Sequence, residues 1–144
     1  MHAHRQRLAM GLTYAGVLPV WIGIGALQFV DIPWIGSGIL AYGAIIVSFI
    51  CGMHWATFMG AAGPLPINLL VTSNLGALSA WGLMLISPWS MPFAFLGLAA
   101  VLGMLLGVDR LLLSARAIEP WFWMLRRNAS IGLGAGLLLW AALS

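Results

Sequence analysis

The feature that most constrains this chain is a series of long apolar runs separated by short breaks. About 20 mostly apolar residues suffice to cross a bilayer as a helix, and five runs qualify, at about 8–30, 35–60, 67–86, 92–115 and 130–143. Strands are disfavoured because the runs lack period-two alternation. The pattern therefore predicts an all-α integral membrane protein, a compact bundle of five transmembrane helices forming a single transmembrane domain over 1–144.

The composition excludes a water-soluble domain. Hydrophobic residues make up 62% of the 144 residues and charged residues only 6%, whereas a soluble domain carries about 25% charged residues. The 6 basic residues are all arginines. They form no basic patch interleaved with stacking side chains, so we expect no nucleic-acid partner.

The breaks between runs carry turn chemistry. DIPW at 31–34, GPLP at 63–66 and SPWSMP at 87–92 each place proline at or near the start of the next helix, where it is tolerated. The fourth break, RAIEPWFWMLRRN at 116–128, is longer and mixes charges with tryptophans. It predicts either an interfacial helix over about 117–128 or the first turns of the fifth helix.

The arginines predict an orientation. With five spans and a cytoplasmic N-terminus, every arginine falls on the cytoplasmic side and Asp31 falls outside, as the positive-inside rule requires. The C-terminus is then periplasmic. The first run resembles a signal peptide but is too long, so we expect an uncleaved span. The absence of an Arg- and Ser-rich transit segment favours the inner membrane of a bacterium over a mitochondrial one.

A histidine, His54, stands inside the apolar run SFICGMHWATFMG at 48–60. A buried polar group is costly unless it finds a partner. Counting along the helices places several polar or amphipathic residues in the same depth band in the cytoplasmic half. The candidate ligand-binding residues are His54, Trp55, Tyr14, Asn74 and Asp109.

Each candidate also has a structural interpretation. His54 is more simply a packing residue, hydrogen-bonded to the third or fourth helix near the cytoplasmic interface. Asp109 is expected to pair with its neighbour Arg110, or instead with His54 or Arg126 across the bundle. Asn68 and Asn74 are expected to donate hydrogen bonds between helices.

Several chemistries lack the residues that they need. A tetrahedral zinc site and a bis-histidine haem have too few intramembrane ligands, and no acid is expected near mid-membrane to couple transport to protons or sodium. We therefore expect no catalytic residue, metal or cofactor. Trp121, Arg126 and Arg127 are expected to anchor the protein at the lipid interface.

Small residues at four-residue spacing indicate faces where helices approach closely. They are Gly52, Ala56 and Gly60; Gly103 and Gly107; and Gly132 and Gly136.

Three segments together resemble a known family. They are TYAGVLPVW at 13–21, AYGAIIVSFICGMHWATFMG at 41–60 and EPWFWMLRRNAS at 119–130. In order and spacing they resemble the small bacterial and mitochondrial family of uncharacterised multi-spanning proteins typified by transmembrane protein 69. Phe122 stands where the resemblance leads us to expect tyrosine. The resemblance implies a compact set of membrane helices and supplies no activity.

Two functional hypotheses follow. The first is a non-enzymatic accessory or assembly subunit that docks by its helix faces onto a larger inner-membrane complex. Its partners would be other integral membrane subunits and membrane lipids. The second is a protein that binds a quinone, lipid or small solute, or conducts protons, through a polar cavity around His54 on the cytoplasmic side.

Overall fold

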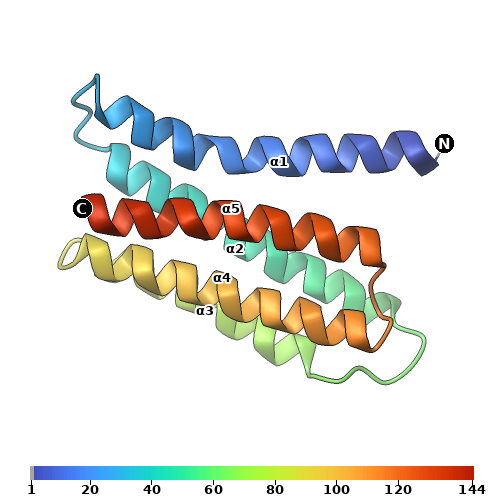
Figure 1. Cartoon of the computed structure of the whole chain (residues 1–144). Helices are drawn as coiled ribbons and strands as arrows, with labels where there is room; N and C mark the ends of the chain where they lie inside the picture. Colours follow the sequence, from blue (N-terminus) through green and yellow to red (C-terminus); the bar gives the residue numbers. More distant parts are fainter. Residues whose placement is uncertain (1) are drawn as a thin grey trace.

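The computed structural model describes residues 2–144 and contains five helices (Figure 1). No strand occurs within this range. The helices are α1 His2–Leu27, α2 Ile35–Gly60, α3 Leu69–Ile86, α4 Met91–Ser114 and α5 Pro120–Leu143.

Four helices, α1 to α4, are long and apolar enough to cross a membrane, which makes this a multi-pass membrane protein. Helix α5 has 24 residues, as many as α4. Its first turns are less apolar because they contain Arg126, Arg127 and Asn128. These turns are continuous with the rest of α5, which begins at Pro120. The sequence also allowed a separate interfacial helix over about 117–128, and most of this stretch is the start of α5.

The helix ends follow from local sequence. The Asn68 side chain accepts hydrogen bonds from the backbone N–H groups of Leu70 and Val71 and so caps α3. Ser90 caps α4 in the same way through the N–H of Phe93. At the other end of α4, Arg116 adopts a positive φ of 59°. The N–H groups of Arg116 and of the next residue bond back to carbonyls of the last turn, as in a Schellman motif.

The core lies between α2, α4 and α5. Leu98, Leu102 and Leu105 of α4 are fully or almost fully buried there. Near the C-terminal end of α5, the ring of Trp140 stacks on Phe95 with 5.7 Å between centroids. Helix α3 packs against α2 and α4. Helix α1 lies on the other side of the bundle, where it contacts α5 and α2 (Figure 1).

Helix α1 is attached to the bundle mainly through its second half. The indole N–H of Trp140 donates to the carbonyl of Val20 over 2.9 Å, and that of Trp21 donates to the carbonyl of Gly132 over 3.0 Å. The Tyr42 hydroxyl donates to the carbonyl of Gly16. The buried residues of α1, Val20 and Gly23, both lie in this second half.

One of the three predicted small-residue faces forms the α1–α5 contact. A Cβ added at Gly136 would lie 2.6 Å from Cγ1 of Val20. At Gly132 it would lie 3.2 Å from Cγ1 of Val17. By contrast, Cβ atoms added at Gly52, Gly60, Gly103 or Gly107 would meet nothing within 4 Å.

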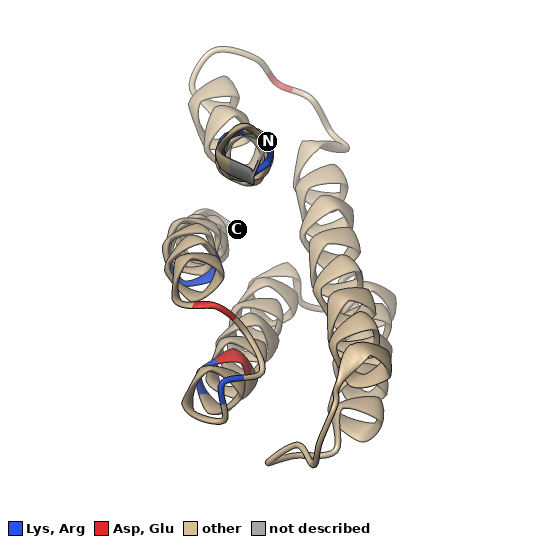
Figure 2. Ribbon diagram, turned by 90° about the vertical axis from the view of Figure 1, so that its right-hand side faces the viewer, with Lys and Arg blue, Asp and Glu red and all other residues tan. Residues whose placement is uncertain are grey.

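The charged residues other than Asp31 lie toward one end of the bundle, which faces the viewer in Figure 2. This arginine-bearing end comprises the start of α1, the α2–α3 loop, the end of α4 and the start of α5 (Figure 1). Asp31 lies in the α1–α2 loop at the opposite end.

The α1–α5 contact predicts a contrast between two glycine-to-alanine substitutions. Gly136→Ala forces a methyl group against Val20, whose β-branched side chain has little freedom to move. We expect it to lower the free energy of unfolding by about 1–3 kcal/mol. Gly103→Ala has open space around it, and we expect no change or a gain of up to about 1 kcal/mol. Unfolding by sodium dodecyl sulfate in mixed micelles measures both; equal midpoints for the two variants would contradict the prediction.

Candidate functional site

Three charged or titratable side chains from three helices meet inside the bundle. Nε2 of His54, on α2, lies 2.8 Å from Oδ1 of Asp109, on α4. The Nε and Nη2 groups of Arg126, on α5, donate to Oδ2 of Asp109 over 3.1 and 2.8 Å. The three residues lie at similar depth, each roughly one and a half turns from its helix end at the arginine-bearing end. We call this arrangement the ion network.

The ion network is buried inside the bundle. His54 is 2% exposed, Asp109 1% and Arg126 7%. With His54 neutral, its Nε2–H donates to the carboxylate, and the charges of Asp109 and Arg126 cancel. Nδ1 of His54 is then an acceptor, and it is buried without a hydrogen-bond partner among residues 2–144.

Such a network has a clear structural effect. Removing one member of a buried ion pair strands the charge of the other in a low dielectric. The network therefore fixes the register of α2, α4 and α5 at this depth. Asp109 is bound to His54 and Arg126, two of the three partners that the sequence suggested. Arg110 donates to neither oxygen of the Asp109 carboxylate. The expected Asp109–Arg110 pair was wrong, because Arg110 points to the exterior and lies over the ring of Trp123, 5.7 Å from its centroid.

Beside the ion network lies an apolar cleft between α1, α2 and α5, with a volume of about 390 Å³. Its α1 wall includes Leu12 and Gly16, and its α2 wall includes Phe49 and Met53. On α5 the wall consists of Trp121, Phe122, Leu125, Arg126, Ala129, Ser130 and Leu133. Leu12 and Phe49 are each 66% exposed, so the cleft opens sideways between α1 and α2. We call it the α1–α2–α5 cleft.

Few polar side chains reach this cleft. Thr13 lines it, but its hydroxyl donates to the carbonyl of Ala9 in its own helix over 2.7 Å. Arg126 lines it too, and its Nε and Nη2 groups donate to Asp109. Ser130, one turn further along α5, lines it as well and is 7% exposed. The cleft is thus a hydrophobic slot with hydrogen-bond donors on one wall.

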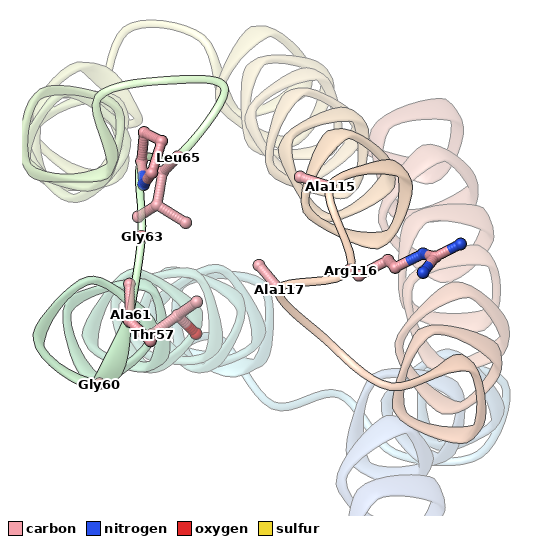
Figure 3. A pocket seen from close by; sticks show the side chains of 10 residues that line it. Thr57, Gly60, Ala61, Gly63, Leu65, Ala115, Arg116 and Ala117 are labelled. Atoms are coloured by element: carbon pink, nitrogen blue, oxygen red, sulfur yellow. The ribbon is translucent and has the colours of Figure 1, made fainter.

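A second hollow, of about 430 Å³, lies at the arginine-bearing end between the α2–α3 loop and the α4–α5 loop (Figure 3). Thr57, Gly60, Ala61 and Ala117 are among its lining residues. The Arg116 side chain extends away from the hollow (Figure 3). Glycine, alanine and backbone make up most of the wall, so it offers few side-chain groups for recognition.

Of the predicted ligand-binding residues, the structure brings together His54 and Asp109. Tyr14 is exposed on α1, and its hydroxyl accepts a hydrogen bond of 3.4 Å from the Asn128 side chain. Trp55 lies on an exposed face of α2. Asn74 is exposed on α3 and donates to the carbonyl of Leu70 in its own helix.

The two asparagines do not join helices as expected. Asn74 bonds within α3, and Asn68 caps the same helix. Both side chains satisfy groups nearby along the chain, which is the common behaviour of asparagine at helix starts.

The predicted interface anchors have different surroundings. Trp121 is half-buried, lines the α1–α2–α5 cleft and donates to the Glu119 carboxylate. Arg127 is exposed and bonds only to its neighbour Asn128, over 3.4 Å. Arg126, expected as an anchor, is the buried cation of the ion network.

Ser130 was not singled out from the sequence. Its signal was its position four residues after Arg126, which places both side chains on one face of the helix. Serines are frequent in membrane helices as packing residues, and this spacing alone does not distinguish Ser130 from them.

Comparison with protein families finds one family profile that covers almost the whole chain. The profile of the family described as "Protein of unknown function (DUF3429)" matches residues 5–143. The chain belongs to the DUF3429 family. The comparisons with curated proteins and with solved structures found no match. The part that matches DUF3429 contains the complete ion network and the complete α1–α2–α5 cleft.

The ion network predicts strong coupling between Asp109 and Arg126. Asp109→Ala leaves Arg126 buried and unpaired, and we expect a loss of roughly 3–5 kcal/mol in the free energy of unfolding. A double variant, Asp109→Leu with Arg126→Met, removes both charges and should lose much less than the sum of its single variants. Arg127→Met, on the exposed side of α5, is the control and should change stability by less than about 0.5 kcal/mol.

Detergent unfolding of the parent protein, Asp109→Leu, Arg126→Met and the double variant gives the coupling energy. Additive losses in the double variant would show that the two side chains act independently, contrary to the ion network.

Proposed function

We propose that this DUF3429 protein is a non-enzymatic membrane protein that binds an apolar or amphiphilic molecule from the bilayer in its α1–α2–α5 cleft. The observation that carries this proposal is the cleft itself. It is apolar, opens sideways between α1 and α2, and has a volume of about 390 Å³. Ligand sites of this kind are mostly hydrophobic with a few placed polar groups.

The ion network supports this function by holding one wall of the cleft rigid. Arg126 belongs to both the network and the wall, so its orientation toward Asp109 also fixes the surface that a ligand meets. A binding site whose polar groups are held by neighbours in this way is preorganised, which lowers the cost of ordering it on binding.

We further propose that the whole chain is one transmembrane domain in which α5 is the fifth span. Helix α5 matches α4 in length and packs along it, with Leu133 and Leu137 buried. The positive-inside rule favours a cytoplasmic location for the arginine-bearing end. The resemblance to the bacterial and mitochondrial family typified by transmembrane protein 69 supports an inner-membrane location.

Single cysteines test this topology. Cys51 is the one native cysteine, so Cys51→Ala provides the background. We expect a cysteine at Ser144 to react with a membrane-impermeant maleimide in intact spheroplasts, and a cysteine at Ala62, in the α2–α3 loop, to react only after lysis. Labelling of both positions from the same side would contradict a five-span topology.

Purification from native membranes in mild detergent, followed by mass spectrometry of retained small molecules, tests cleft binding. We expect one class of apolar molecule to copurify. Ala129→Leu adds bulk on the α5 wall of the cleft and should abolish its retention. Ala100→Leu makes the same change on an exposed face of α4 and should leave retention unchanged. Retention that is equal in both variants would exclude the cleft as the site.

The accessory-subunit hypothesis is the second candidate, and one observation favours it. The small-residue faces of Gly52 with Gly60 and of Gly103 with Gly107 have open space around them, as docking faces for other helices would. The same purification distinguishes the two candidates. A stoichiometric integral membrane partner supports the accessory role, and a lone protein argues against it.

A further inference from the structure

The hydroxyl of Ser130 differs from the other buried and partly buried hydroxyls in the helices that the structure describes. A serine or threonine in a membrane helix usually donates to a carbonyl three or four residues earlier. Ser73 does so toward Leu70, and Ser48 toward Ala44. Ser130 makes no hydrogen bond within the described residues, although it is only 7% exposed. Ser130 lines the α1–α2–α5 cleft.

Arg126 supplies a second donor on the same wall. Its Nε and Nη2 groups both donate to Oδ2 of Asp109. Its Nη1 group makes no hydrogen bond within residues 2–144. Arg126 and Ser130 are four residues apart on α5, so the two side chains are neighbours on one helix face.

These two groups define the polar chemistry that the cleft recognises. A guanidinium N–H can only donate, and a hydroxyl with no acceptor nearby has a proton to donate. A ligand that satisfies both must present a hydrogen-bond acceptor. A hydrocarbon alone would leave both donors unpaired in an apolar slot, which costs free energy.

The charge balance decides between a neutral and an anionic acceptor. Asp109 already neutralises Arg126, and the two lie in contact. An anionic head group would place a second negative charge beside Asp109 with one cation between them, in a region from which water is excluded. A neutral acceptor adds no charge and accepts hydrogen bonds from the two remaining donors, the Ser130 hydroxyl and Nη1 of Arg126.

We propose that the α1–α2–α5 cleft binds a long-chain molecule through a neutral carbonyl oxygen that accepts hydrogen bonds from Ser130 Oγ and Arg126 Nη1. This inference rests on the proposed cleft function and names the chemistry of its ligand. Two membrane molecules carry such a carbonyl on an apolar chain, an ester-linked glycerolipid and an isoprenoid quinone.

A competition experiment separates this inference from the proposed function. Purified protein in detergent is labelled with a diazirine-bearing alkane, and labelled peptides are located by mass spectrometry. Labelling of cleft residues supports cleft binding, and its absence overturns the proposed function. Carbonyl competitors are then compared with matched molecules that lack the carbonyl: a diester glycerolipid with its diether analogue, and a decyl-quinone with a decyl-benzene.

We expect at least one carbonyl competitor to displace the alkane more strongly than its carbonyl-free partner, and the pair that does so identifies the source. Equal competition within both pairs overturns the inference while leaving the cleft function intact. A long-chain fatty acid in its ionised form should compete more weakly than its methyl ester. Stronger competition by the ionised acid would overturn the charge argument.

Ser130→Ala tests the hydroxyl directly. We expect it to weaken competition by the carbonyl molecule about threefold to tenfold, the effect of one neutral hydrogen bond. The readout is the ratio of competition by the carbonyl molecule to competition by its carbonyl-free partner within each variant, so a change of the cleft that affects both molecules equally cancels. Ser130→Thr keeps the hydroxyl and should restore most of the carbonyl preference. Ser79→Ala, an exposed serine on α3, is the matched control. A carbonyl preference that survives in Ser130→Ala would overturn the role of Ser130.

Discussion

The carboxylate of Asp109 is the point on which this bundle depends. It accepts from His54 and from Arg126, so a single side chain ties α4 to α2 and to α5 at the same depth. In apolar surroundings these hydrogen bonds and the ion pair are strong. Because the three side chains are buried, water offers none of them an alternative partner. Apolar packing between these helices tolerates small shifts along their axes, but the ion network does not.

Helix α1 stands outside this arrangement. The hydrogen bonds of the ion network do not involve it, a single bond of 3.4 Å from Asn128 reaches its first half at Tyr14, and its shorter hydrogen bonds to the bundle come from Tyr42, Trp140 and its own Trp21. These contacts lie toward the end opposite the arginines, so the first half of α1 is left to line a cleft instead of filling it. The cleft thus results from two different modes of attachment, ionic among three helices and aromatic for the fourth.

The sequence was sufficient for the helical architecture because each apolar run is bounded by proline, glycine or a capping residue. It also named Asp109, His54 and Arg126 as possible partners, since charges in apolar helices have few ways to be satisfied. It also suggested a pair between Asp109 and Arg110. That pair does not form, because neighbours in sequence point to different faces of a helix. The cleft depends on how far α1 leans from α2 and α5, and no local pattern encodes that angle. Ser130 was missed for the same reason.

The aromatic attachment of α1 has a consequence for how the protein tolerates change. The acceptors at Gly16, Val20 and Gly132 are backbone carbonyls, which every residue type supplies. Substitution of a side chain at those three positions therefore leaves the acceptor in place and changes the size of the side chain. At these positions the contact between α1 and the bundle therefore depends on the size of the side chain rather than on the residue type. Exchange of one residue for another of similar size leaves these hydrogen bonds intact.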